Sequence, residues 1–129
     1  MIEDLINRVA TAAGLDPAVA SKAIGMILGF LQKEGPTEQV NTMLAALPGT
    51  SELIAQAEAD GGGGGLMGMM GGMMGGGIMG LGAKLMGAGL DMGQISTVGR
   101  ELLTAGREQA GDDVVGQIVA GTPGLSQFV

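Results

Sequence analysis

Cysteine, histidine, tryptophan and tyrosine are all absent from this sequence of 129 residues. Without cysteine, no disulfide framework can hold the fold together. Without histidine and cysteine, the chain lacks the usual general base near neutral pH and the usual thiol nucleophile. We therefore predict that the protein is not an enzyme, with no catalytic residues and no cofactor.

Aromatic and basic side chains are scarce. Phe30 and Phe128 are the only aromatic residues, and six scattered basic residues face thirteen acidic ones, for a net charge of −7. Binding to nucleic acid requires clustered lysine and arginine, usually with aromatic faces for stacking on single strands. This class of partner is therefore excluded. The same charge balance disfavours electrostatic attraction to anionic lipids but leaves a purely apolar membrane insertion open.

The start of the chain does not have the pattern of a secretory signal. Glu3 and Asp4 stand among apolar residues at helical spacing, where a signal would carry basic residues and a continuous apolar stretch. We expect a cytoplasmic protein of bacterial type.

The chain does contain an internal repeat. At a constant offset of 75, residues 13–16 (Ala-Gly-Leu-Asp) recur at 88–91, and Pro-Gly at 48–49 recurs at 123–124. Further matches at this offset are Ser21 with Ser96, Leu28 with Leu103, Val40 with Val115, and Ala45 with Ala120. With a core limited to aliphatic residues, which favours helices, the repeat predicts an all-α protein with two copies of a small helical-bundle unit.

Apolar spacing and breaker residues place the helices. In the first copy we predict helices at 2–13, 17–33, 37–47 and 51–59, arranged as a small antiparallel bundle. In the second copy we predict a helix at 92–109 and another that follows a cap at Asp112 and ends before the break at 122–124. The predicted caps are Asp16, Ser51, Asp91 with Gln94, and Asp112. The residues predicted to face inward are Ile2, Leu5, Ile6, Val9, Ala13, Ala20, Ala23, Ile24, Ile27, Leu28, Leu31, Val40, Met43, Leu44, Leu47, Ile95, Val98, Leu102, Leu103, Val114, Val115, Ile118 and Val119.

These elements give predicted boundaries of 1–59 for the first copy and 78–129 for the second, with a Gly/Met segment at 60–77. Each copy of about fifty residues is marginal for independent folding. We expect the copies to pack on each other or on neighbouring chains.

Residues 61–83 carry no charge and have glycine at every fourth position from 64 to 80. On a helix this spacing makes a stripe that lets two backbones approach closely, so we predict that chains contact one another through Gly64, Gly68, Gly72, Gly76 and Gly80. Each interior glycine costs about 0.8–1 kcal/mol relative to alanine, so a helix here requires burial of its large side chains. A flexible linker and a membrane anchor over 61–83 are the alternatives, because 23 residues in a helix just cross a bilayer core of about 30 Å.

Methionines in the same segment suggest a remote alternative, a Cu(I) site, because thioethers are soft ligands. The candidate ligands are Met67, Met69, Met70, Met73 and Met74. No histidine or cysteine accompanies them, and methionine is more often an adaptable apolar filler. Asp112 and Asp113 are typical of a helix start rather than a cation site, and Glu101, Arg107 and Glu108 are interpreted as a solvated helix face.

The first copy resembles small uncharacterised helical domains of bacteria. The residues that carry the resemblance are Leu5-Ile6-x-x-Val9, Gly14-Leu15-Asp16-Pro17, Ile24-x-x-Ile27-Leu28 and Ala45-Ala46-Leu47-Pro48-Gly49. It covers roughly residues 1–57 and, more loosely, 78–129, and it implies a helical unit with a Pro-Gly turn beside a glycine-rich stretch. It implies no catalytic or binding residues. The sequence therefore predicts a non-catalytic protein whose partner is another copy of itself.

Overall fold

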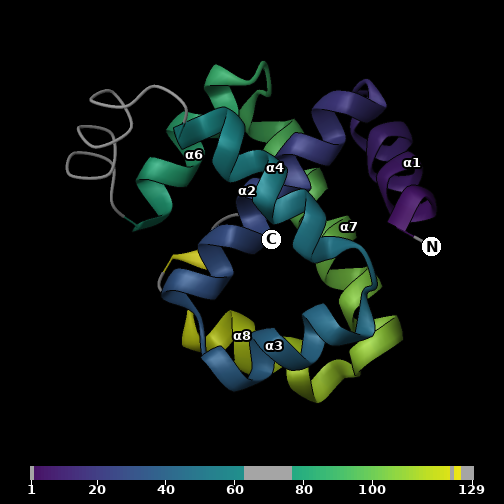
Figure 1. Cartoon of the computed structure of the whole chain (residues 1–129), viewed down its shortest axis with the longest axis vertical. Helices are drawn as coiled ribbons and strands as arrows, with labels where there is room; N and C mark the ends of the chain where they lie inside the picture. The colour runs from purple at the N-terminus through teal and green to yellow at the C-terminus, as the bar shows by residue number, and fades with distance from the viewer. Residues whose placement is uncertain (1, 63–76, 123, 126–129) are drawn as a thin grey trace.

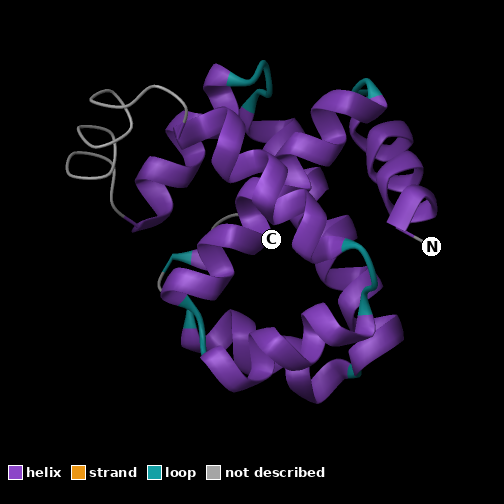
Figure 2. Cartoon of the chain, in the orientation of Figure 1, coloured by secondary structure: helices purple, strands orange, loops and turns teal. Residues whose placement is uncertain are grey.

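The computed structural model describes residues 2–62, 77–122, 124 and 125. Within these ranges the chain is helical and has no strand, so the all-α prediction is confirmed (Figures 1 and 2). The helices are α1 (Ile2–Ala13), α2 (Pro17–Glu34), α3 (Thr37–Ala46), α4 (Thr50–Gly62), α6 (Gly77–Gly87), α7 (Met92–Ala110) and α8 (Asp112–Gly121).

Helix boundaries follow the glycine and proline signals of the sequence. α1 ends at Ala13 as predicted, because Gly14 has a φ of 70°, a left-handed conformation that closes a helix at little cost for glycine. The predicted starts at Pro17 and Thr37 are confirmed. α7 and α8 are separated by Gly111, whose φ is 104°.

The start of α7 is the predicted capping box. The Asp91 carboxylate accepts a hydrogen bond from the Gln94 amide at 2.8 Å, and the Gln94 side-chain oxygen accepts one from the Asp91 amide at 3.0 Å. Two backbone N–H groups that have no partner within the helix are satisfied in this way.

The other three predicted side-chain caps do not form. Asp16 holds the predicted N-cap position of α2, but its side chain makes no capping hydrogen bond. Asp112 is the first residue of α8, so Gly111 occupies the cap position. α4 begins at Thr50, one residue before Ser51, and the buried Thr50 hydroxyl donates to the Leu47 carbonyl at 2.8 Å. A carboxylate or hydroxyl near a helix start predicts the start well, but whether it caps depends on the approach of the preceding turn.

This difference between two aspartates gives a matched test. Asp91→Ala is expected to lower the free energy of unfolding by about 1 kcal/mol, because it removes a capping bond. Asp16→Ala is expected to cost less, since no such bond is lost. Urea unfolding followed by circular dichroism measures both values, and equal losses from the two variants would contradict the assignment.

α2 is the central helix, and α1, α4, α6 and α7 all pack against it (Figure 1). It is buried on more than one face: Ala20, Ala23, Ile24, Gly25, Ile27, Leu28, Gly29 and Leu31 are all inaccessible or nearly so. All six residues of this helix predicted to face inward are buried, and the four predicted in α7 are buried as well. Six other predicted inward residues are only partly buried: Ile2, Ile6, Ala13, Leu44, Val114 and Val119.

α4 lies very close to α2, and Gly25 is the reason. A Cβ atom at Gly25 would stand 2.3 Å from the Leu53 carbonyl oxygen and 2.9 Å from Cβ of Ala57. Only glycine permits this distance between the two backbones. The close approach buries Leu53, Ile54 and Ala57 of α4 against α2.

The N-terminal part (residues 2–62) and the C-terminal part (residues 77–125, without 123) share one apolar core. α1 packs mainly on α7, α6 mainly on α2, and α3 on α8, which lies beside it in Figure 1. The expectation that these two parts pack on each other is confirmed. The predicted antiparallel bundle is wrong for α1 and α2, since the chain bends by only 105° between them and α1 turns away to cover α7.

Candidate functional site

Most residues of the predicted contact and metal sites lie outside the described residues. This holds for Gly64, Gly68, Gly72 and Gly76, and for Met67, Met69, Met70, Met73 and Met74. Gly80 is described: it is buried in α6, which packs on α2. In this structure the last glycine of the stripe therefore belongs to the core of its own chain.

α6 shows how a glycine-rich stretch of this chain becomes helical. It has four glycines in eleven residues, and each interior glycine costs about 0.8–1 kcal/mol relative to alanine. Burying a leucine returns about 1.5–3 kcal/mol, and Leu81 and Leu85 are both buried. Packing on α2 thus offsets the poor helix propensity, as expected from the sequence.

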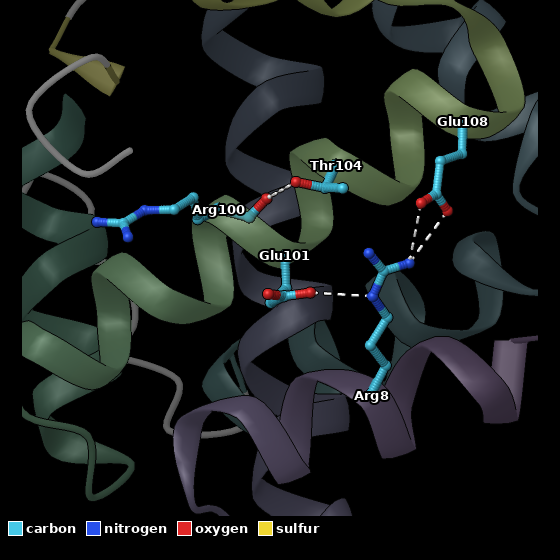
Figure 3. A network of polar contacts seen from close by, with 5 residues as sticks. All are labelled: Arg8, Arg100, Glu101, Thr104 and Glu108. Carbon is cyan, nitrogen blue, oxygen red and sulfur yellow. Dashed lines mark hydrogen bonds and ion pairs between the residues drawn. The ribbon is translucent and has the colours of Figure 1, made fainter.

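A polar cluster joins α1 to α7 on the surface. Nε of Arg8 donates to Glu101 at 2.9 Å, and a terminal guanidinium nitrogen donates to Glu108 at 3.0 Å (Figure 3). Glu101 and Glu108 are seven residues apart, so they lie two turns apart on one face of α7. Both hydrogen bonds, that to Glu108 first and that to Glu101 second, raise the pKa of Arg8 above its ordinary value. One guanidinium of α1 therefore bridges two carboxylates of α7.

The sequence interpretation of Glu101 and Glu108 as a solvated face missed this cluster. Both carboxylates keep some exposure, 29% and 52%, and the Arg8 side chain is 41% exposed. Their spacing along one helix face was visible in the sequence, but their partner lies more than ninety residues away. Exposed ion pairs contribute about 0.2–1 kcal/mol each because water and salt screen them. Their main effect is to orient α1 on α7.

Two further hydrogen bonds cross between the two parts of the chain. The Gln94 amide group donates to the Ala13 carbonyl at 3.2 Å, and the Gln39 amide group donates to the Gln117 side-chain oxygen at 2.6 Å. The first joins the end of α1 to the start of α7, and the second joins α3 to α8. Together with Arg8 they form a polar rim around apolar contacts, the arrangement that interfaces between proteins have.

A cavity of about 220 Å³ opens beside the Arg8 cluster. Its wall is formed by α1, the turn between α3 and α4, and the end of α7: Ile2, Asp4, Leu5, Arg8, Ala46, Leu47, Pro48, Ala105, Glu108 and Gln109. Pockets for small molecules usually measure about 300–1,000 Å³, so this one is small. Arg8 and Glu108 already bind each other at its edge, which leaves the cavity without a free charge pair for a ligand.

The described residues offer no other chemistry of the predicted kinds. Within them, no three histidine, cysteine, aspartate or glutamate side chains gather around a point that could hold a metal ion. Asp112 and Asp113 are exposed in the first turn of α8. None of the described helices is by itself long and apolar enough to cross a membrane, although α1 and α2 taken together pass by length and composition with a bend of 105°.

Comparison of the chain with protein-family models, with curated proteins and with solved structures finds no match. Among the described residues, the most extensive set of polar and apolar contacts is the surface between the N-terminal and C-terminal parts.

Proposed function

We propose that the protein is a non-catalytic helical protein that self-associates, built by duplication of one helical unit and packing between chains through the Gly/Met segment. The proposal has two components, and each has its own support. The duplication rests on helix boundaries and turn geometry. The self-association rests on exposed apolar side chains next to a charge-free segment.

Helix positions support the duplication. Moved back by 75 residues, α6, α7 and α8 span 2–12, 17–35 and 37–46, against Ile2–Ala13, Pro17–Glu34 and Thr37–Ala46 for α1, α2 and α3. Three successive helices and the two breaks between them thus recur in register to within one residue. Independent helices of a chain have no reason to agree in length and spacing in this way.

Turn geometry supports it further. Gly14 and Gly89 both have a positive φ, and in each case the amide of the next residue donates to the carbonyl five residues back, at 2.8 and 3.2 Å. This is the Schellman closure of a helix end. Gly49 and Gly124, the second pair at this offset, also share a positive φ, of 92° and 79°.

The packing of the helices is reciprocal as well. α1 of the N-terminal part packs on α7, and its counterpart α6 packs on α2, the counterpart of α7. The self-equivalent pairs, α2 with α7 and α3 with α8, also touch. These four pairs follow the pattern of a twofold dimer, in which a contact occurs twice or lies on the axis.

Self-association is supported by methionines that remain uncovered at the C-terminal end of α6. Met86 in α6 and Met92 at the start of α7 are 49% and 54% exposed. Exposed apolar side chains of this size are available for contact with another chain, and methionine adapts to varied partners. In the sequence they follow the charge-free residues 61–83, with Lys84 and Asp91 between. This exposure is the observation that carries the proposed self-association.

The double variant Gly72→Leu, Gly76→Leu tests the contact between chains. If two backbones approach each other along the glycine stripe, leucine prevents that approach and the oligomeric mass in light scattering is expected to change. Gly116→Leu in α8 is the matched control, because nothing lies within 4 Å of its Cβ position, and its mass should equal that of the wild type. An unaltered mass of the double variant would defeat the proposed contact. Flotation with liposomes separates a membrane anchor from a soluble assembly, which stays at the bottom of the gradient.

A further inference from the structure

The surface between the N-terminal and C-terminal parts has the features of an interface that a second chain can form. Its interior is apolar and fitted: Met43 of α3 lies over Gly106 of α7, where a Cβ atom would come within 2.7 Å of the methionine sulfur. Its rim is polar, with Arg8 bound to Glu101 and Glu108. Shape and charge are therefore complementary across it.

A single stretch of chain, residues 63–76, connects the two parts. Fourteen residues can span at most about 50 Å, so the C-terminal part can reach the N-terminal part of its own chain or that of a neighbouring one. The same surface can thus be formed within one chain or between two.

We propose that two chains associate by exchange, with the C-terminal part of each packed on the N-terminal part of the other. The partner is a second copy of this chain, and the surface is the one already seen within the chain. This inference rests on the proposed self-association and adds a second surface between chains beside the Gly/Met segment. Every contact of the single chain then recurs in the dimer, including the Arg8 cluster, now formed between chains. Exchange of identical elements is a low-cost route to a dimer for this reason.

The charges select the second copy over an unrelated partner. Both parts carry an excess of acidic residues, so general electrostatics oppose association between them. At the contact itself, however, Arg8 of the N-terminal part lies against two carboxylates of the C-terminal part. A partner must therefore present paired carboxylates at this spacing over an apolar face, and α7 of another copy does so.

Reversing the charges in two different chains tests the exchange. One chain carries Arg8→Glu, and the other carries Glu101→Arg with Glu108→Arg. Within either chain alone, the cluster brings like charges together, whether it folds as a single chain or pairs with its own kind. In an exchanged dimer made of one chain of each type, both clusters join opposite charges. The mixed pair is thus the one arrangement that relieves repulsion at both contacts.

The two chains, one of them isotope-labelled, are mixed in denaturant, refolded and examined by native mass spectrometry. Random pairing gives about half mixed dimers, and labelled wild type with unlabelled wild type should show this value. Exchange is expected to raise the mixed fraction of the charge-reversed pair well above it. Mixed dimers at the random fraction, or no dimers, would overturn the exchange.

Failure of the exchange can be distinguished from failure of the proposed self-association. Dimers that pair at random mean that the chains associate through another surface, so self-association stands and exchange fails. Circular dichroism covers the case in which each variant alone is unfolded. Recovery of helix on mixing would then support exchange, and a mixture that stays unfolded would overturn it.

Discussion

Gly25→Ala is expected to lower the free energy of unfolding by about 1–3 kcal/mol, the usual cost of forcing an extra methylene into a packed core. The new Cβ would stand 2.3 Å from the Leu53 carbonyl oxygen and 2.8 Å from its carbon. These are backbone atoms of α4, so no side-chain rotation relieves the clash and α4 must move away from α2. The gain in helix propensity from alanine, about 0.8–1 kcal/mol, offsets only part of this loss.

Gly116→Ala is the matched control and should change the free energy of unfolding in the opposite direction. Gly116 also lies inside a helix, but it is exposed and nothing lies within 4 Å of its Cβ position. Alanine there is expected to stabilise the protein by about 0.5–1 kcal/mol. Gly106→Ala should fall between the two, because its closest neighbour is the flexible Met43 side chain. Thermal unfolding of the three variants orders them, and a Gly25→Ala variant as stable as wild type would contradict the packing of α4 on α2.

Leu28→Ala and Leu103→Ala are each expected to destabilise the whole chain by about 2–5 kcal/mol, the range for emptying a buried leucine site. Leu28 in α2 is fully buried and Leu103 in α7 is 2% exposed, and both belong to the core that the two parts share. Because that core is continuous, damage in either part should shift one common transition.

Denaturant unfolding, combined with hydrogen exchange of individual amides, measures whether the two parts unfold in one common transition. Leu28→Ala in α2 should raise exchange in α7 and α8 as well as in its own part. Met92→Ala, at an exposed residue, is the control and should stay within about 0.5 kcal/mol of wild type. Two separate transitions, with the C-terminal part unfolding at its wild-type denaturant concentration, would show that the parts are independent.

The two predictions also show which features were accessible from sequence. The burial of Leu28 and Leu103 follows from apolar periodicity along single helices, so it was predicted correctly. The importance of Gly25 was not predicted. In the sequence it is one glycine among 27, and the only effect that can be read from it there is a lower helix propensity. Its role depends on α4, which begins 25 residues later and lies against it only after folding.

The features of the candidate site also divide into those that the sequence shows and those that only the structure shows. The glycine stripe and the methionine run are patterns within one segment, so they could be found by reading along the chain. The Arg8 cluster joins residues more than ninety positions apart, and nothing local distinguishes Arg8 from the other five basic residues. The offset of 75 was the strongest long-range signal, since it related the breaks before α7 and α8 to those before α2 and α3, whereas the helix α6 was not predicted.

By itself, the sequence determined that the chain is helical and where most of its helices start and stop. These properties depend on groups a few residues apart: the positive φ of Gly14, the fixed φ of Pro17, and the exchange of hydrogen bonds between Asp91 and Gln94. Only the tertiary structure decided that α1 leaves α2 to cover α7, that Arg8 binds two carboxylates, and that α4 presses on Gly25. Those contacts bury apolar surface between residues far apart in the sequence, and contact between distant surfaces has no counterpart in local spacing.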